Sequence, residues 1–139
     1  MTKLWVSPTS PTLGSVLDPL TAACREDFVP ERLHFVGNRD LAPRLDDIEA
    51  KARDIVDIYG ESPVVDRSLV EREVDIAEFS TAFQDAVDVP DAEVAVNMTP
   101  GRKFMSAIAL QIGIREGAAH VYYLYIRDED QIQTIYPAM

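Results

Sequence analysis

Residues 93–103 read EVAVNMTPGRK, and this stretch passes from an apolar strand through a polar turn into a helix. Glu93–Val96 is typical of a buried strand. Pro100 suits the first turn of a helix, where its missing amide donor costs nothing. We therefore expect a strand and then a helix that continues to about Glu116, with the segment Asn97–Lys103 at their junction.

Strands and helices alternate on both sides of this stretch. Before this stretch we expect, in chain order, a strand at Lys3–Ser7, a helix capped by Ser15, a strand at Arg32–Gly37, a helix at Pro43–Tyr59, a strand at Val70–Ile76 and a helix at Phe79–Val87. After it we expect a strand at His120–Ile126, a turn at Arg127–Asp130 and an antiparallel strand at Gln131–Tyr136. Val64-Val65 is the other candidate for the third strand, and of the two we take Val70–Ile76 as the sheet member.

This alternation predicts an α/β domain with a mainly parallel sheet that is covered by helices on both faces. Right-handed crossovers leave few topologies, and the doubly wound order 3-2-1-4-5 is the commonest with this number of elements. The C-terminal hairpin adds one antiparallel strand. Ligands bind such sheets at the carboxyl ends of strands one and four, where the direction of winding reverses. We therefore look for a site in the loops Ser7–Gly14 and Asn97–Lys103.

Length and composition fit a single domain over residues 1–139. Apolar residues make up 47% of the chain, which is enough for a core, and no run approaches the length of about 18–20 apolar residues that a membrane span needs. The N-terminal apolar residues reach Pro8 too soon for a secretory signal. We expect a cytoplasmic protein that does not associate with a membrane.

The charge is strongly acidic. The formal net charge is −11, and the basic residues are ten Arg against three Lys. Such a surface is a poor platform for duplex nucleic acid, which is held mainly by neutralising its phosphates. Excess acid with little lysine also resembles proteins adapted to high intracellular salt, that is, of a halophilic source.

Several kinds of catalytic site are disfavoured. Cys24 is the only cysteine, and in a helix we interpret it as a small buried apolar group. His34 and His120 lie in expected strands, where core packing explains them, so neither a zinc site nor a Ser-His-Asp triad is expected. The chain has no GxGxxG fingerprint and no P-loop spacing, so we expect no nicotinamide cofactor and no metal.

The junction after the fourth strand suits an anion. A helix start offers unpaired amides and the positive end of the helix dipole, and Gly101 allows close approach of the backbone. Arg102 and Lys103 are unfavourable at a helix start by about 0.3–1 kcal/mol unless an anion is present. Asn97 and Thr99 add donors and acceptors. The alternative is an ordinary helix cap with solvated Arg102 and Lys103.

Two further features belong to this hypothesis. The loop after the first strand carries the hydroxyls of Ser7, Thr9 and Ser10, which could orient a ligand or position a nucleophile, although loops are often rich in Ser and Thr without a functional reason. The helix over residues 104–116 is apolar around most of its circumference. A helix on a sheet needs only an apolar stripe, so a second copy of the chain or neighbouring helices must cover the rest.

The pattern Asn97-x-Thr99-x-x-x-Lys103, in this place and with this order of elements, resembles the CRISPR-associated Rossmann-fold (CARF) domains over nearly the whole chain. The resemblance implies a Rossmann-like domain that forms a homodimer and binds a ring of 3′–5′-linked adenylates, the second messenger of type III CRISPR complexes in antiviral defence. By similarity, Thr99 and Lys103, with the backbone at Gly101 and Arg102, would hold phosphates and riboses, and Asn97 would order the loop.

Most members of that family carry an effector domain, which this chain is expected to lack. Two outputs therefore stay open. The chain is either a metal-independent ring nuclease, with Lys103, Arg102 and Ser10 as candidate catalytic residues, or a binding module that sequesters the ligand or transmits its binding to a separate effector protein. A third alternative is another nucleotide or phosphate ligand on the same scaffold.

Overall fold

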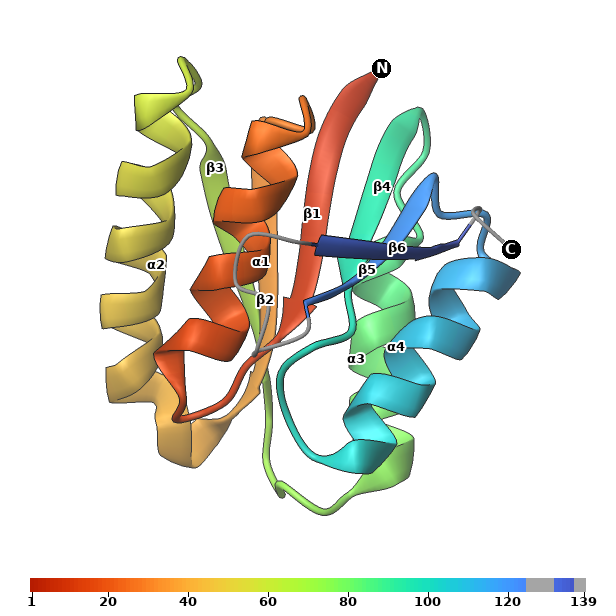
Figure 1. Cartoon of the computed structure of the whole chain (residues 1–139). Coiled ribbons are helices and arrows are strands. Elements are labelled where there is room, and N and C mark those ends of the chain that lie inside the picture. The colour runs from red at the N-terminus through yellow and green to blue at the C-terminus, as the bar shows by residue number, and fades with distance from the viewer. Residues whose placement is uncertain (125–131, 137–139) are drawn as a thin grey trace.

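The computed structural model describes residues 1–124 and, as backbone, residues 132–136, which form one sheet with four helices (Figure 1). The strands are β1 Thr2–Pro8, β2 Arg32–Asn38, β3 Val64–Val70, β4 Ala92–Asn97, β5 His120–Leu124 and β6 Ile132–Tyr136. Their order is β3-β2-β1-β4-β5-β6, in which β6 is antiparallel to β5 and the other neighbours are parallel. The predicted doubly wound order with an antiparallel final strand is confirmed.

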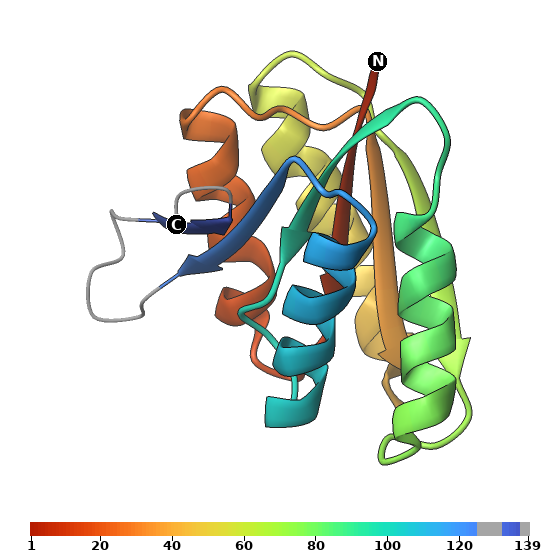
Figure 2. The same ribbon diagram turned by 90° about the vertical axis from the view of Figure 1, so that its right-hand side faces the viewer.

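The helices cover both faces of the sheet, with α1 and α2 on one face and α3 and α4 on the other (Figures 1 and 2). They span α1 Leu13–Arg25, α2 Ala42–Ile58, α3 Ile76–Val87 and α4 Lys103–Arg115, and a short 3-10 helix, η1, covers Arg39–Leu41. None of the helices in the described part of the chain is long and apolar enough to cross a membrane.

Each face of the sheet has its own core. On β1, Trp5 packs with Phe35 and the helices α1 and α2, whereas Leu4 and Val6 pack with Phe79 and the helices α3 and α4. All five of these side chains are at most 1% exposed. A parallel strand that is buried on both faces is apolar without alternation, which explains the continuous apolar run at the start of the chain.

The third strand differs from the prediction. It is Val64–Val70, and only Val70 of the expected strand Val70–Ile76 belongs to the sheet. The polar residues inside β3 hide the strand pattern, but they are accommodated because β3 is the edge of the sheet. Asp66 pairs with Arg32 at 3.2 Å, and Arg67 reaches Asp46 of α2 at 2.7 Å.

Two predicted helix starts are also wrong. The helix α1 begins at Leu13 after Thr12, so Ser15 is not its N-cap; Ser15 lies in the first turn and donates its hydroxyl to the Thr12 carbonyl at 2.8 Å. The helix α4 begins at Lys103 after Arg102, so Pro100 lies before it. The reason is Gly101, whose φ of +92° is incompatible with a right-handed helix.

The hairpin is confirmed only as a pairing of strands. Strand β5 pairs antiparallel with β6, from Leu124 opposite Ile132 to Val121 opposite Tyr136. The expected turn at residues 127–130 and the end of the predicted strand at residues 125–126 lie outside the described residues.

A candidate anion site at the carboxyl ends of β1 and β4

The buried side chain of Asn97 connects the elements around the site. Its Nδ2 donates to Ser7 Oγ at 3.1 Å and to the Ser15 carbonyl at 3.4 Å, and its Oδ1 accepts from the Thr99 amide at 3.0 Å. These bonds join the end of β4 to the end of β1, to the first turn of α1, and to the loop before α4. Asn97 therefore fixes the relative positions of both loops.

Ser7 and Thr9 brace the loop after β1 from within. Both are buried; Ser7 Oγ donates to the Pro8 carbonyl at 2.7 Å, and Thr9 Oγ1 donates to the Val36 carbonyl at 3.3 Å. A Cβ at Gly37 would lie 2.5 Å from Thr9 Oγ1, so the glycine leaves room for this contact. The loop after β1 is thus attached to β2 as well as to β4.

Ser10 lies in the same loop and is half-buried. Its Oγ accepts from the Thr12 amide at 3.0 Å and lies 3.2 Å from Ser15 Oγ. Among the described residues, no titratable base hydrogen-bonds to Ser10. Neighbouring groups therefore position the hydroxyl, but none of them is placed to remove its proton.

The loop before α4 is held on its other side by Thr99. Thr99 Oγ1 accepts from the Leu124 amide at 3.0 Å, which ties the loop to β5. A hydroxyl that accepts one hydrogen bond keeps its own proton to donate. At Gly101, a Cβ would lie 2.7 Å from Met105 Sδ, so both its φ and its surroundings call for glycine.

The two predicted cations are exposed and differ in their contacts. Lys103 is the first residue of α4. Arg102 donates from Nε to Glu73 Oε1 at 2.7 Å, and Glu73 comes from the loop between β3 and α3. This hydrogen-bonded pair raises the pKa of Arg102 and lowers the pKa of Glu73.

A hollow of about 180 Å³ lies among these loops. Its lining residues come from the ends of β1 and β2 and from the loops before α3 and α4: Thr9, Ser10, Pro11, Asn38, Leu41, Glu73, Gly101, Arg102 and Met105. Four of the predicted site residues therefore line it. Ser7 and Asn97 lie buried behind it, and Thr99 and Lys103 are not part of its lining.

Sequence reasoning missed Asn38 and Glu73. Asn38 ends β2 as Asn97 ends β4, and its Oδ1 accepts from the Leu41 amide at 3.1 Å, so a polar residue at a strand end was the available signal. Glu73 had no such signal, because its loop was predicted as a strand.

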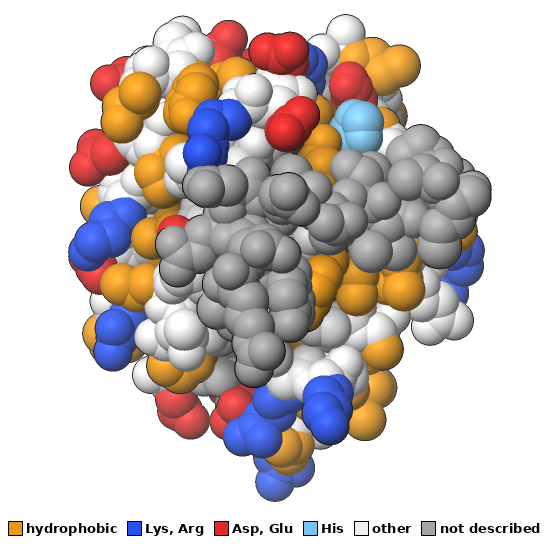
Figure 3. Space-filling model, viewed as in Figure 1, with side chains coloured by type: hydrophobic (Ala, Val, Ile, Leu, Met, Phe, Trp, Pro, Cys, Tyr) orange, Lys and Arg blue, Asp and Glu red, His pale blue; other side chains and the backbone are white. Residues whose placement is uncertain are grey.

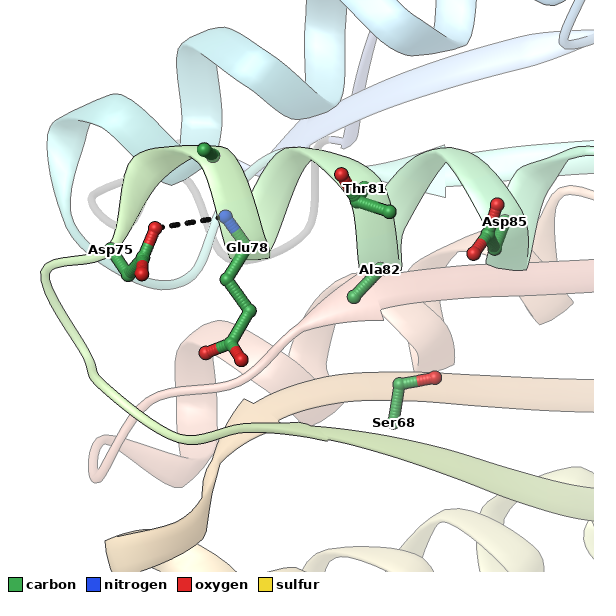
Figure 4. A pocket seen from close by; sticks show the side chains of 7 residues that line it. Ser68, Asp75, Glu78, Thr81, Ala82 and Asp85 are labelled. Atoms are coloured by element: carbon green, nitrogen blue, oxygen red, sulfur yellow. Dashed lines mark hydrogen bonds between the residues drawn. The ribbon is translucent and has the colours of Figure 1, made fainter.

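The charge at this end of the molecule fits an anion better than the net charge suggests. Figure 3 shows Lys and Arg side chains gathered at the end of the molecule where α4 begins. A larger hollow between β3 and α3 has the opposite character: Asp75, Glu78 and Asp85 line it, beside Ser68 (Figure 4). Among the described residues, three carboxylates and no Lys or Arg line that hollow, so it repels an anion, whereas Glu73 in the smaller hollow is paired with Arg102. The smaller hollow is therefore the candidate site.

Cys24 and the histidines lie elsewhere. His34 Nε2 is 2.7 Å from Ser68 Oγ on the α3 side of the sheet, and burial lowers the pKa of His34. His120 begins β5 and stacks on Tyr122 at 5.4 Å. Cys24 is 3% exposed, which confirms it as a buried group, and burial raises the pKa of its thiol to about 11.

No model of a known protein family matches the sequence, and no curated protein matches it. Solved structures do share its fold. Can2 from Sulfobacillus thermosulfidooxidans, in complex with cyclic tetra-adenylate, aligns with a TM-score of 0.75 and 14% identity over 99% of this chain. A type III CRISPR defence DNA nuclease activated by cyclic oligoadenylate aligns with a TM-score of 0.65 and 22% sequence identity over 89% of this chain. Csm6 from Enterococcus italicus, bound to cyclic hexa-2′-fluoro-hexa-dAMP, aligns with a TM-score of 0.66 and 15% sequence identity over 90% of this chain.

The chain shares the fold of these proteins, and the Rossmann-like fold that the resemblance in its sequence implies is confirmed. It spans only a part of each of them: 36% of the Can2 chain, 34% of the Csm6 chain and 19% of the nuclease chain.

Proposed function

We propose that this chain binds a cyclic oligoadenylate with the loops at the carboxyl ends of β1 and β4, and so acts in type III CRISPR antiviral signalling. The observation that carries the proposal is the position of Asn97-x-Thr99-x-x-x-Lys103. It lies at the switch point of a fold shared with proteins that were solved with, or are activated by, such rings.

The residues divide into a supporting and a contacting group. Asn97 and Ser7 are buried and hold the loops in place. Lys103 and Arg102 would neutralise phosphates, Thr99 would donate its hydroxyl proton, and the backbone at Gly101 would lie against the ligand. Thr9 and Ser10 form the opposite wall of the hollow and would face a ribose or a base.

A homodimer would complete the site. The helix α4 buries Met105, Ala109 and Ile112 against the sheet, whereas Phe104, Ile108 and Leu110 are half-buried and Ile114 is 39% exposed. A two-fold axis along this apolar face would bring two copies of the Asn97–Lys103 loop together, which suits a ligand that has its own symmetry. We propose this face as the dimer contact.

The proposal extends to the setting of the protein. Residues 1–139 would act as one nucleotide-binding domain in the cytoplasm, would need no duplex nucleic acid, and would pass the signal to a separate effector protein. The acidic composition would then reflect a salt-rich cell, so binding is best measured at high salt.

Cleavage of the ring is the second candidate, as a metal-independent ring nuclease. A ribose 2′-oxygen would attack the adjacent phosphorus, the bond to the 5′-oxygen would break, and a 2′,3′-cyclic phosphate and a 5′-hydroxyl would result. Arg102 and Lys103 favour this step because they would stabilise charge on the phosphate. Glu73 is a weak base for the 2′-proton, because Arg102 lowers its pKa, so we propose binding as the main function.

The Lys103→Ala variant tests the site. We expect about a tenfold or greater loss of affinity for cyclic tetra- or hexa-adenylate, equivalent to at least about 1.4 kcal/mol, because an exposed lysine at the helix start neutralises a phosphate. The measurement is calorimetric titration, with circular dichroism to show an unchanged fold.

Lys51→Ala is the matched control. Lys51 is a surface lysine on α2, away from the loops. Its Nζ lies 2.6 Å from Asp47 Oδ1. Unchanged affinity in Lys103→Ala, or an equal loss in Lys51→Ala, would show that the site is assigned wrongly.

A further inference from the structure

Glu73 is a carboxylate placed at the cationic side of the proposed anion site. Its Oε1 accepts from Arg102 Nε at 2.7 Å, and both side chains line the hollow between the loops. The side chain of Glu73 is 43% exposed and that of Arg102 is 56% exposed, so a ligand can reach both.

The loop that carries Glu73 is braced by hydrogen bonds. Glu78 Oε1 accepts from the amides of Glu71 at 2.6 Å and Arg72 at 3.4 Å. Asp75 caps α3 by accepting from the Glu78 amide at 3.0 Å (Figure 4), and the Asp75 amide donates to the Arg72 carbonyl at 3.1 Å. Glu73 therefore stands beside Arg102 as part of a braced turn.

A fixed carboxylate beside an anion site does not repel all phosphates equally. A phosphodiester carries one negative charge, whereas a phosphomonoester carries about 1.5 to 2 near neutral pH. Coulomb repulsion scales with that charge and is stronger near a protein surface than in bulk water. Arg102 also keeps Glu73 ionised, since it lowers the pKa of the carboxylate.

We infer that Glu73 is a specificity-determining residue that makes this site accept phosphodiesters and reject phosphomonoesters. The inference rests on the proposed anion site and names its ligand class more narrowly. A ring of nucleotides contains only diesters, whereas mononucleotides and linear fragments with a terminal phosphate contain a monoester. Specificity of this kind comes from a repulsive element built against the wrong ligand.

The Glu73→Gln variant tests this. It keeps the shape of the side chain and removes its charge. We expect the affinity for AMP to rise by about fivefold or more and the affinity for cyclic tetra-adenylate to rise by less, so that the preference for the ring falls by about threefold. Both ligands are titrated calorimetrically, AMP up to millimolar concentration, at one salt concentration that is low enough to leave the repulsion unscreened.

Two variants serve as controls. Glu71→Gln removes the same charge from the same loop, but Glu71 pairs with Arg39 at 2.6 Å, and neither residue lines the hollow. It should leave the ratio of affinities unchanged. Glu73→Asp keeps the charge and should restore most of the discrimination.

Other results would overturn the inference. Equal gains for both ligands, no AMP binding by Glu73→Gln at millimolar concentration, or the same shift in Glu71→Gln would show that Glu73 does not discriminate. Weaker ring binding by Glu73→Gln would show that the carboxylate accepts a hydrogen bond from the ligand instead. If the wild-type protein binds neither ring, the proposed function fails, whereas a gain in AMP binding by Glu73→Gln that Glu71→Gln does not share would still show that Glu73 repels the monoester.

Discussion

The polar side chains at the site already have structural partners before a ligand arrives. Asn97 Nδ2 is bonded to Ser7 Oγ, Thr99 Oγ1 accepts from the Leu124 amide, and Thr9 Oγ1 donates to the Val36 carbonyl. A site whose groups are fixed in this way loses less conformational entropy on binding, so more of its interaction energy appears as affinity. The exposed Lys103 is the exception, and its ordering would oppose binding.

Two buried residues predict that the fold weakens at alkaline pH. Burial raises the pKa of the Cys24 thiol to about 11 and, with added repulsion from Glu26 and Glu93, that of the Tyr122 hydroxyl to about 12. The unfolded chain loses these protons at about pH 8.5 and about pH 10. It therefore binds fewer protons than the folded chain in this interval, and the free energy of unfolding falls as pH rises from about 8.5 towards 12.

Urea unfolding at about pH 7.5 and about pH 10.5 checks this prediction. The unfolding midpoint should be lower at the higher pH, and a Cys24→Ala variant should show a smaller decrease, because only Tyr122 then contributes. The same midpoint at both pH values would contradict the assignment of these two groups as buried and protonated.

At the scale of single residues, the sequence predicts what is local. Asn97, Thr99 and Lys103 lie within one short segment, and their spacing after an apolar strand is visible without a structure. Glu73 and Asn38 reach the same hollow from other loops. Nothing in their own neighbourhoods shows that they lie beside Arg102, since this depends on how β2 and β3 are placed next to β1.

At the scale of elements, the helix α4 has one face that packs on the sheet and one that we propose contacts a second copy of the chain. Ile112 is 3% exposed and lies within the core, whereas Ile108 is half-buried and packs against the edge of the core with part of its side chain exposed. We predict that Ile108→Glu gives monomers and weakens ring binding while the fold persists, because it places a charge in the proposed dimer contact. Sedimentation velocity gives the state of assembly, and circular dichroism gives the fold.

Ile112→Glu is the informative contrast. A carboxylate at this position would lie inside the core, so we expect this variant to lose its fold rather than only its assembly. If Ile108→Glu sediments as the wild-type protein does, the proposed dimer contact on α4 is wrong.

The sequence predicts a strand best where the whole strand is buried in the core, because its residues are then apolar throughout. The apolar strands β1, β2 and β4 were predicted to within two residues at each end, because they are buried on both faces. For the edge strand β3, the sequence offered two candidates, and the rejected one, at Val64-Val65, begins the strand. Its Asp66, Arg67 and Ser68 are compatible with a strand only through partners far away in the sequence, such as Arg32 and Asp46. Gly101 likewise moves the start of α4 past Pro100.

At the scale of the whole molecule, the topology explains why the candidate site lies where it does. The crossovers after β1 and β4 leave in opposite directions, so their loops lie side by side at the carboxyl edge of the sheet. The alternation of strands and helices was enough to predict this order. The ligand cannot be predicted from the topology, because proteins of one fold bind many different ligands. It rests on the residues of the two loops and on the proteins that share the fold.

One measurement tests the central proposal most directly. Purified protein is incubated at high salt with cyclic tetra-adenylate and with cyclic hexa-adenylate, binding is measured by calorimetry, and products are separated by chromatography. The proposal predicts that at least one ring binds, with one ring for two chains. Linear products with a 2′,3′-cyclic phosphate would show that the protein is also a ring nuclease. Binding without any change to the ring would show that it acts as a sensor. If neither ring binds to well-folded protein, the proposed function is wrong.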